Sequence, residues 1–219
     1  MGKLTKDLIE KLKVMDTTCV SDALDRLEIK GGCEGILPIV RGVKAVGPAF
    51  TVKYRPCGVE KGTVGDFLDD VQPGQVVAID NGGRTHVTVW GDIMTFYAQR
   101  RGLAGTVIDG VCRDVPQIIE SKYPIYTRGR FMVTGKGRVE VEGVNVPISI
   151  GGVQVKPDDI MLCDDTGVVV IPAGEAEDVL TVAIEINKAE EKILELLEMG
   201  LTLREARMQV GYHKLSQKR

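Results

Sequence analysis

A repeated alternation of strand-like and helix-like segments occupies the middle of the chain. Residues 75–80 and 104–109 are short apolar runs, and helical patterns follow them over residues 90–101 and 115–122. Strands that are buried on both faces have this apolar character, and a helix between two such strands returns the second strand parallel to the first. The central segment therefore predicts βαβ units with parallel strands in one sheet.

The segments on either side of this centre are expected to complete one domain. No linker or repeat interrupts the sequence, so residues 1–219 are predicted to form a single α/β domain with a mixed sheet and a long C-terminal helix. The other predicted elements are helices at 4–15, 20–27 (capped by Thr17 and Thr18), 64–71, 173–199 and 201–211 (opened by Thr202), strands at 36–40, 43–54 (interrupted by Pro48), 139–150, 160–163 and 168–171, and a loop at 81–83.

Charge and composition exclude several classes of protein. The formal net charge is -3, whereas a nucleic-acid-binding protein needs a basic face. No apolar run approaches the roughly 20 residues that cross a bilayer, and the first residues lack the apolar stretch of a signal peptide. The five cysteines are odd in number and include no C-x-x-C pair, as expected for a reducing compartment. We therefore expect a cytoplasmic protein without nucleic-acid or membrane partners.

Histidine is scarce, with only His86 and His213 in the chain. This scarcity removes most zinc sites and most histidine-dependent catalysis. A bound metal would have to be held by carboxylates, and oxygen ligands favour Mg2+ or Mn2+.

Two carboxylates and an arginine are placed to meet at one end of the predicted sheet. Asp92 stands at the start of a helix that runs about 15 Å away from the sheet end, and Arg113 and Asp114 follow a strand that returns by roughly 20 Å. Ligands bind where the loops gather at the strand ends of parallel sheets. Together with the free amides of Ile93 and Met94 at the helix start, this set suits chelation and polarisation of a small 2-oxo acid.

The same residue types have a purely structural interpretation, which the residues alone leave open. Asp92 and Asp114 could each cap the helix that follows them, and Arg113 could form a surface ion pair.

The spacing of these residues resembles the signature of a known enzyme family. Gly91-Asp92, twenty further residues and then Arg113-Asp114 match the G-D-x20-R-D motif of the 4-hydroxy-4-methyl-2-oxoglutarate/4-carboxy-4-hydroxy-2-oxoadipate aldolases, a family that includes the regulator of ribonuclease activity A. Stretches at 20–24, 80–83, 107–110, 164–172 and 211–213 are similar to the family as well, so the resemblance covers nearly the whole chain.

The resemblance implies a class II, Mg2+- or Mn2+-dependent pyruvate aldolase that also decarboxylates oxaloacetate. In such an enzyme Asp114 would bind the metal directly and Asp92 would hold its water ligands. Arg113 would bind the oxo and carboxyl oxygens of the substrate, and Gly91 with the amides of Ile93 and Met94 would face the substrate carboxylate.

The family resemblance also implies a fold and an assembly. The fold is of the swivelling β/β/α type, built as trimers or dimers of trimers. A glutamate from the C-terminal helix of a neighbouring subunit completes the site, and Glu190 is the best match here, with Glu191 second.

Four other residues are candidates for roles at or near the site. Arg84 and His86, which the motif does not specify, could select the part of the substrate beyond the pyruvyl group. Cys112 has no histidine near it in the sequence and is expected to be a packed thiol rather than a nucleophile. Lys53 is the one candidate for a Schiff base, and is expected instead to face solvent.

Two competing functions belong to other classes. A non-enzymatic regulator that binds and inhibits a ribonuclease is the first, but the intact motif argues against this as the only role. Some relatives carry a demethylmenaquinone methyltransferase label, but residues 80–83 do not form the glycine-rich loop that such an enzyme needs.

Overall fold

The computed structural model describes residues 5–59 and 62–211. In this part of the chain α-helices alternate with β-strands and two short 3-10 helices. The helices are α1 (Lys6–Lys13), α2 (Thr17–Arg26), α3 (Asp92–Arg100), α4 (Val115–Ser121), α5 (Ala176–Glu198) and α6 (Leu203–Val210), with 3-10 turns at η1 (Asp66–Asp70) and η2 (Ala173–Glu175). The strands are β1 (Leu37–Pro38), β2 (Ala45–Pro56), β3 (Val76–Thr88), β4 (Gly105–Cys112), β5 (Ile125–Arg130), β6 (Val139–Val144), β7 (Ile148–Ile150), β8 (Val153–Val155), β9 (Ile160–Cys163) and β10 (Val168–Ile171).

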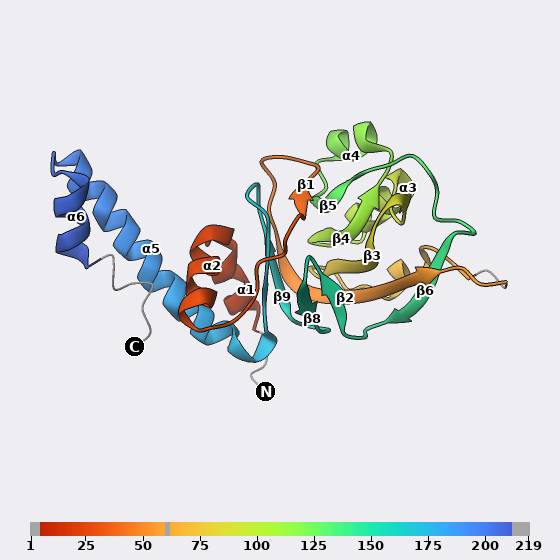
Figure 1. Ribbon diagram of the computed structural model, residues 1–219, viewed down its shortest axis with the longest axis horizontal. Coiled ribbons are helices and arrows are strands. Elements are labelled where there is room, and N and C mark those ends of the chain that lie inside the picture. Colours follow the sequence, from red (N-terminus) through yellow and green to blue (C-terminus); the bar gives the residue numbers. More distant parts are fainter. Residues whose placement is uncertain (1–4, 60–61, 212–219) are drawn as a thin grey trace.

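The main sheet is mixed, with a parallel centre. Its strand order is β1-β5-β4-β3-β2-β9-β10, and β6 pairs with β2 off this path. Strands β2 to β5 are parallel neighbours, whereas β1, β6, β9 and β10 pair in the antiparallel sense. The predicted βαβ units are therefore confirmed, because α3 joins β3 to β4 and α4 joins β4 to β5 (Figure 1).

Side chains on alternate positions of the central strands build two cores. In β3, Val77 and Ile79 pack on the face covered by α3 and α4, whereas Val76 and Ala78 pack with the β7–β8 hairpin on the other face. A third core forms where α1, α2 and the first half of α5 cover β9 and β10. The predicted α/β class with a mixed sheet and a long C-terminal helix is confirmed, and no helix of the described residues is long and apolar enough to cross a membrane.

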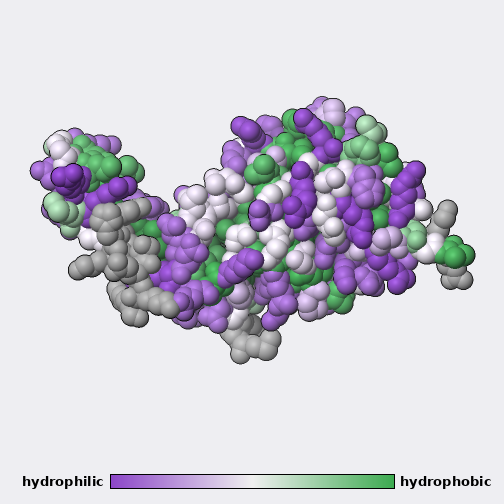
Figure 2. Space-filling model, viewed as in Figure 1, coloured by the Kyte–Doolittle hydropathy of each residue, from purple (hydrophilic) through white to green (hydrophobic). Residues whose placement is uncertain are grey.

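The second half of α5 and α6 form an arm that extends from the body, on the side opposite α3 (Figure 1). The arm has its own small core around Ile193, Leu196 and Ala206. The prediction that Thr202 opens the last helix is confirmed, since its side chain and that of Glu205 form a capping box. Figure 2 shows apolar surface at the tip of the arm among hydrophilic side chains.

Three local predictions were wrong. The N-cap of α2 is Asp16, which accepts a hydrogen bond from the Cys19 amide at 2.7 Å, so Thr17 and Thr18 lie inside the helix. Strand β2 runs through Pro48 without interruption. The expected loop at 81–83 is part of β3, where Gly82 and Gly83 adopt positive φ angles and the pairing with β4 shifts register.

The strand-rich segment after β5 contains more and shorter strands than its sequence pattern indicated. The predicted strand at 139–150 is two strands, β6 and β7, that turn at Asn145, where φ is +52°. Strands β5 and β8 were not predicted. His213 and the rest of the 211–213 match beyond Gly211 lie outside the described residues.

Candidate active site

Hydrogen bonds join the start of α3 to the residues that follow β4. Strand β4 continues to Cys112, so Arg113 follows it directly, and the Arg113 amide donates to the carbonyl oxygen of Trp90 at 3.0 Å. The Asp92 amide donates to Oδ2 of Asp114 at 3.2 Å. The sequence-based expectation that these residues share one end of the sheet is confirmed.

Asp114 has an unusual backbone conformation for its residue type. Its φ and ψ angles are 58° and 38°, in the left-handed region that aspartate tolerates better than most residues. It stands at the N-cap position of α4, but its side chain makes no capping hydrogen bond there. The carboxylate lies against the start of α3 instead, so the capping interpretation of Asp114 is wrong.

Gly91 leaves the space that the Asp114 carboxylate occupies. A Cβ atom at position 91 would lie 2.5 Å from Oδ2 of Asp114 and 3.4 Å from Nε of Arg113. The backbone of Gly91 is extended, with φ at -150°, so any residue could adopt it. The requirement for glycine is therefore set by the close approach of Asp114.

Replacing Gly91 with alanine should lower turnover about a hundredfold, because displacing a reacting group by ~1 Å has costs of this size. The thermal unfolding midpoint should change little, since the Asp114 side chain can swing away from the new methyl group. Gly174→Ala is the matched control, because a Cβ there meets nothing within 4 Å. Steady-state kinetics and circular dichroism melts measure the two effects. A Gly91→Ala variant with near-normal turnover would contradict this account of the site.

The side chains of Arg113, Asp114 and Asp92 remain accessible. Nε of Arg113 lies 3.3 Å from Oδ2 of Asp114, and the two side chains are 37% and 31% exposed. Gly91 and not Asp92 is the N-cap of α3, although Oδ1 of Asp92 accepts from the amide of Ile93 at 2.8 Å within the first turn. Ile93 and Met94 belong to the first turn of α3, where N–H groups have no acceptor within the helix.

A buried tryptophan ties these elements together. The indole N–H of Trp90 donates to the Thr95 hydroxyl at 2.9 Å, and that hydroxyl donates to the Gly91 carbonyl oxygen at 2.9 Å. The Thr88 hydroxyl lies 3.0 Å from the carbonyl oxygens of both Trp90 and Val111. This network fixes the start of α3 against the ends of β3 and β4.

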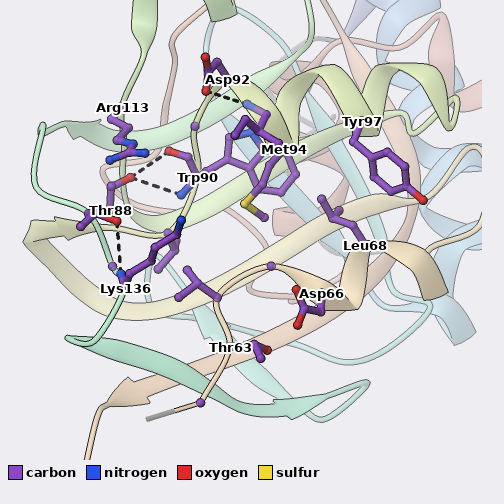
Figure 3. A pocket seen from close by; sticks show the side chains of 18 of the residues that line it. Thr63, Asp66, Leu68, Thr88, Trp90, Asp92, Met94, Tyr97, Arg113 and Lys136 are labelled. Atoms are coloured by element: carbon purple, nitrogen blue, oxygen red, sulfur yellow. Dashed lines mark hydrogen bonds between the residues drawn. The ribbon is translucent and has the colours of Figure 1, made fainter.

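A pocket of about 530 Å³ opens beside this network. Arg113 and Asp92 lie at one end of it, and Tyr97 and the 3-10 turn η1 form the opposite wall (Figure 3). A second hollow, of about 320 Å³, lies on the other side of Arg113 and is lined by Asp114. The sequence did not indicate Lys136, Trp90, Tyr97 or the remaining pocket residues, which are Gly62, Thr63, Val64, Gly65, Asp66, Leu68, Asp69, Thr88, Val89, Thr134 and Gly135.

The other candidates from the sequence lie elsewhere. Arg84 and His86 are not among the described residues that line the pocket, and Arg84 donates instead to the Asn81 carbonyl oxygen at 2.7 Å. Lys53 pairs with Glu142 at 3.1 Å on the partly exposed face of β2. Cys112 is fully buried, and burial raises the pKa of its thiol to about 12. The expectation of a packed, unreactive thiol is confirmed.

Glu190 does not lie at this site within the same chain. Helix α5 packs on α1 and α2, on the side of the body away from α3 (Figure 1). Partial burial and the nearby carboxylates of Asp22 and Asp16 raise the pKa of Glu190. Glu191 is exposed and accepts a hydrogen bond from Asn187 at 2.9 Å.

The donor set fits a hard divalent cation held largely by water. Among the described residues no group of three or more His, Cys, Asp or Glu side chains could hold a metal. The backbone of Asp92 nevertheless lies against the Asp114 carboxylate, which among the described residues accepts from this one amide and lies beside the Arg113 guanidinium. Mg2+ is commonly bound by one or two carboxylates while it keeps several waters and contacts the substrate.

The chain belongs to the RraA-like family described as Aldolase/RraA, whose model matches residues 17–170. Protein DlpA of Legionella pneumophila is 38% identical over 212 residues; the match covers 95% of this chain but only 34% of the length of DlpA. A protein of Halalkalibacterium halodurans, provisionally named a 4-hydroxy-4-methyl-2-oxoglutarate aldolase, is 35% identical over 82% of this chain and 83% of its own length.

Solved structures share the fold. A protein of unknown function from Pseudomonas syringae pv. tomato is 40% identical, with a TM-score of 0.89 over 94% of this chain and 100% of its own. RraAS2 of Streptomyces coelicolor, described as an unusual member of the RNase ES inhibitor RraA protein family, is 28% identical, with a TM-score of 0.78 over 87% of this chain and 97% of its own.

Proposed function

We propose that the chain is a divalent-metal-dependent class II pyruvate aldolase, which cleaves 4-hydroxy-2-oxo acids to pyruvate and also decarboxylates oxaloacetate. The observation that carries this proposal is the convergence of Arg113, Asp114 and Asp92 at the N-terminus of α3, beside a pocket of about 530 Å³. Membership of the Aldolase/RraA family and the provisional aldolase name of a relative support the reaction class.

The residues of this chain suit the binding of a 2-oxo acid. The amide of Met94 at the positive end of α3 would donate to the substrate carboxylate, together with the Ile93 amide once it exchanges its hydrogen bond to Oδ1 of Asp92 for one to the substrate. The planar fork of Arg113 would bind the oxo and carboxyl oxygens. Negative charge develops on the oxo oxygen as the bond between C3 and C4 breaks, and the guanidinium would stabilise it. Mg2+ or Mn2+, held by Asp114 with Asp92 at its waters, would supply Lewis-acid polarisation of the same group.

Removal of the metal should abolish activity. Dialysis against EDTA is expected to reduce pyruvate release to background, and added Mg2+ or Mn2+ should restore it, because carboxylate oxygens are the available ligands. The measurement follows pyruvate from a panel of 4-hydroxy-2-oxo acids and from oxaloacetate. Borohydride trapping of substrate on Lys53 or any other lysine, with activity retained in EDTA, would replace this mechanism by Schiff-base chemistry.

Inhibition of a ribonuclease is the second candidate function, favoured by the description of the Streptomyces relative as a member of an RNase inhibitor family. A variant at the candidate site distinguishes the two functions. An Arg113→Lys variant should lose aldolase turnover, whereas a regulator that acts through its outer surface would inhibit ribonuclease cleavage equally well with either residue.

A further inference from the structure

Lys136 extends from a turn that is anchored to the end of β3. The Thr88 amide donates to the carbonyl oxygen of Val133 at 3.0 Å, and Thr88 forms a β-bridge with Thr134. Gly135 packs so closely that a Cβ atom there would overlap the backbone oxygen of Thr88. The turn is closed by hydrogen bonds from the amide of Lys136 to the Thr134 hydroxyl and from the amide of Val139 to the Gly135 carbonyl oxygen. The base of the Lys136 side chain is therefore fixed relative to Trp90.

The side chain of Lys136 enters the pocket that Arg113 and Asp92 line. Figure 3 shows Lys136 and Arg113 reaching toward the same hollow, with the segment from Thr88 to Trp90 between them. Among the described residues no carboxylate lies within ion-pair distance of the Lys136 ammonium group. The pocket is therefore lined by one positively charged side chain, that of Lys136, in addition to the arginine that would bind the pyruvyl group.

The opposite wall of the pocket has the reverse charge. Asp66 and Asp69 line it from η1, and Oδ1 of Asp69 accepts a hydrogen bond from the Tyr97 hydroxyl at 2.5 Å. An anionic group on a bound substrate would be repelled from this wall and attracted to the Lys136 side. The charges of the pocket would therefore orient a substrate with a second carboxylate so that this carboxylate lies on the Lys136 side.

We propose that Lys136 is a specificity-determining residue, whose ammonium group binds an anionic substituent on the substrate beyond the pyruvyl part. The inference rests on the proposed function, because the pyruvyl group must occupy the Arg113 end for the substituent to reach Lys136. Arg84 and His86, the residues that the sequence suggested for this role, do not line the pocket within this chain.

A matched pair of substrates tests the proposal by turnover. In 4-hydroxy-2-oxoglutarate C4 carries a carboxylate, and in 4-hydroxy-2-oxopentanoate C4 carries a methyl group at the same position. Lys136→Met should lower kcat/KM for the first about ten- to a hundredfold, since a hydrogen bond between charged groups is lost. The value for the second should change less than about threefold, and Lys136→Arg should restore most of the loss. Lys156→Met is the control, because Lys156 is also exposed and lies outside the pocket.

A binding measurement separates this proposal from the proposed reaction. 2-Oxoglutarate and 2-oxopentanoate differ by the same replacement but lack the 4-hydroxyl group, so retro-aldol cleavage is not available to them. With Mg2+ present, calorimetry should show tighter binding of 2-oxoglutarate to the wild type, and Lys136→Met should remove the difference. If this holds without cleavage of any hydroxy acid, the aldolase proposal fails and the role of Lys136 stands. Equal affinities in the wild type, or an unchanged ratio of affinities or of kcat/KM in Lys136→Met, would overturn the role of Lys136.

Discussion

Replacing Asp114 with asparagine should lower metal-dependent pyruvate release by on the order of a hundredfold or more, with the fold intact. Asparagine preserves the shape of the side chain and tolerates the left-handed backbone at this position, where φ is 58°, but it removes the negative charge that a divalent cation requires. Asp114→Ala should be equally inactive, and less stable because alanine is strained in that conformation. Titration with Mg2+ should show a raised half-activating concentration for the asparagine variant.

Arg113→Lys should lose activity to a similar extent for a different reason. An ammonium group cannot reproduce the two parallel N–H donors of a guanidinium, but the proposed metal ligands remain. The half-activating Mg2+ concentration should therefore stay near the wild-type value while kcat falls. Asp158→Asn and Arg41→Lys are the matched controls, because Asp158 has the same left-handed backbone on an exposed surface and Arg41 is exposed. Near-normal pyruvate release from both site variants would show that the chemistry lies elsewhere.

The sequence predicted the centre of the fold well because the strand–helix–strand pattern there is compatible with only one arrangement, a parallel sheet. Strands β3 and β4 are buried on both faces, and the helices between such strands force parallel pairing. The Asn81-Gly82-Gly83 pattern predicts a loop because glycine and asparagine usually mark turns, whereas here the two glycines have positive φ angles in a bulge inside a long strand. Pro48 within β2 and the short strands β5 and β8 were predicted wrongly or not at all for the same reason, since tertiary pairing overrides local preference.

The residues of the candidate site likewise fall into those that the sequence could predict and those that it could not. Asp92, Arg113 and Asp114 could be brought together from the sequence because a single helix and strand separate them. Lys136 could not, because its turn reaches the pocket only through the long-range pairing between Thr88 and Thr134. No local signal distinguishes it from other exposed lysines. Arg84, by contrast, is next to the site in the chain, and a bulge in β3 turns it toward its own backbone.

A shared active site would account for two features that a lone subunit leaves unexplained. Ile93 and Met132 are apolar residues in or beside the two hollows, yet they are 79% and 74% exposed. On the arm, Met199 and Met208 are 73% and 67% exposed. Contact between the arm of one subunit and the site of the next would remove both surfaces from water. We propose that the chain assembles as a trimer or a dimer of trimers in this way.

In this arrangement Glu190 of one subunit would reach the water ligands of the metal at Asp114 of its neighbour. Glu190→Ala should therefore be inactive but still assembled, as size-exclusion chromatography with light scattering would show. Glu191→Ala is the control for register, because Glu191 is exposed one position along the same helix. A fully active monomer would exclude a shared site. If Glu191→Ala were inactive and Glu190→Ala had normal activity, Glu191 rather than Glu190 would be the residue that completes the neighbouring site.

Complementation between two inactive variants is the strongest form of this test. Asp114→Asn supplies an intact glutamate, and Glu190→Ala supplies an intact metal ligand. Mixed subunits should recover about a quarter of wild-type activity after exchange, because one of four random pairings across each head-to-tail interface carries both intact halves. The activity should follow the rate of subunit exchange, measured by energy transfer between labelled subunits. Exchange without recovery would contradict the shared-site proposal, because the two intact halves would then be present at the same interface without activity.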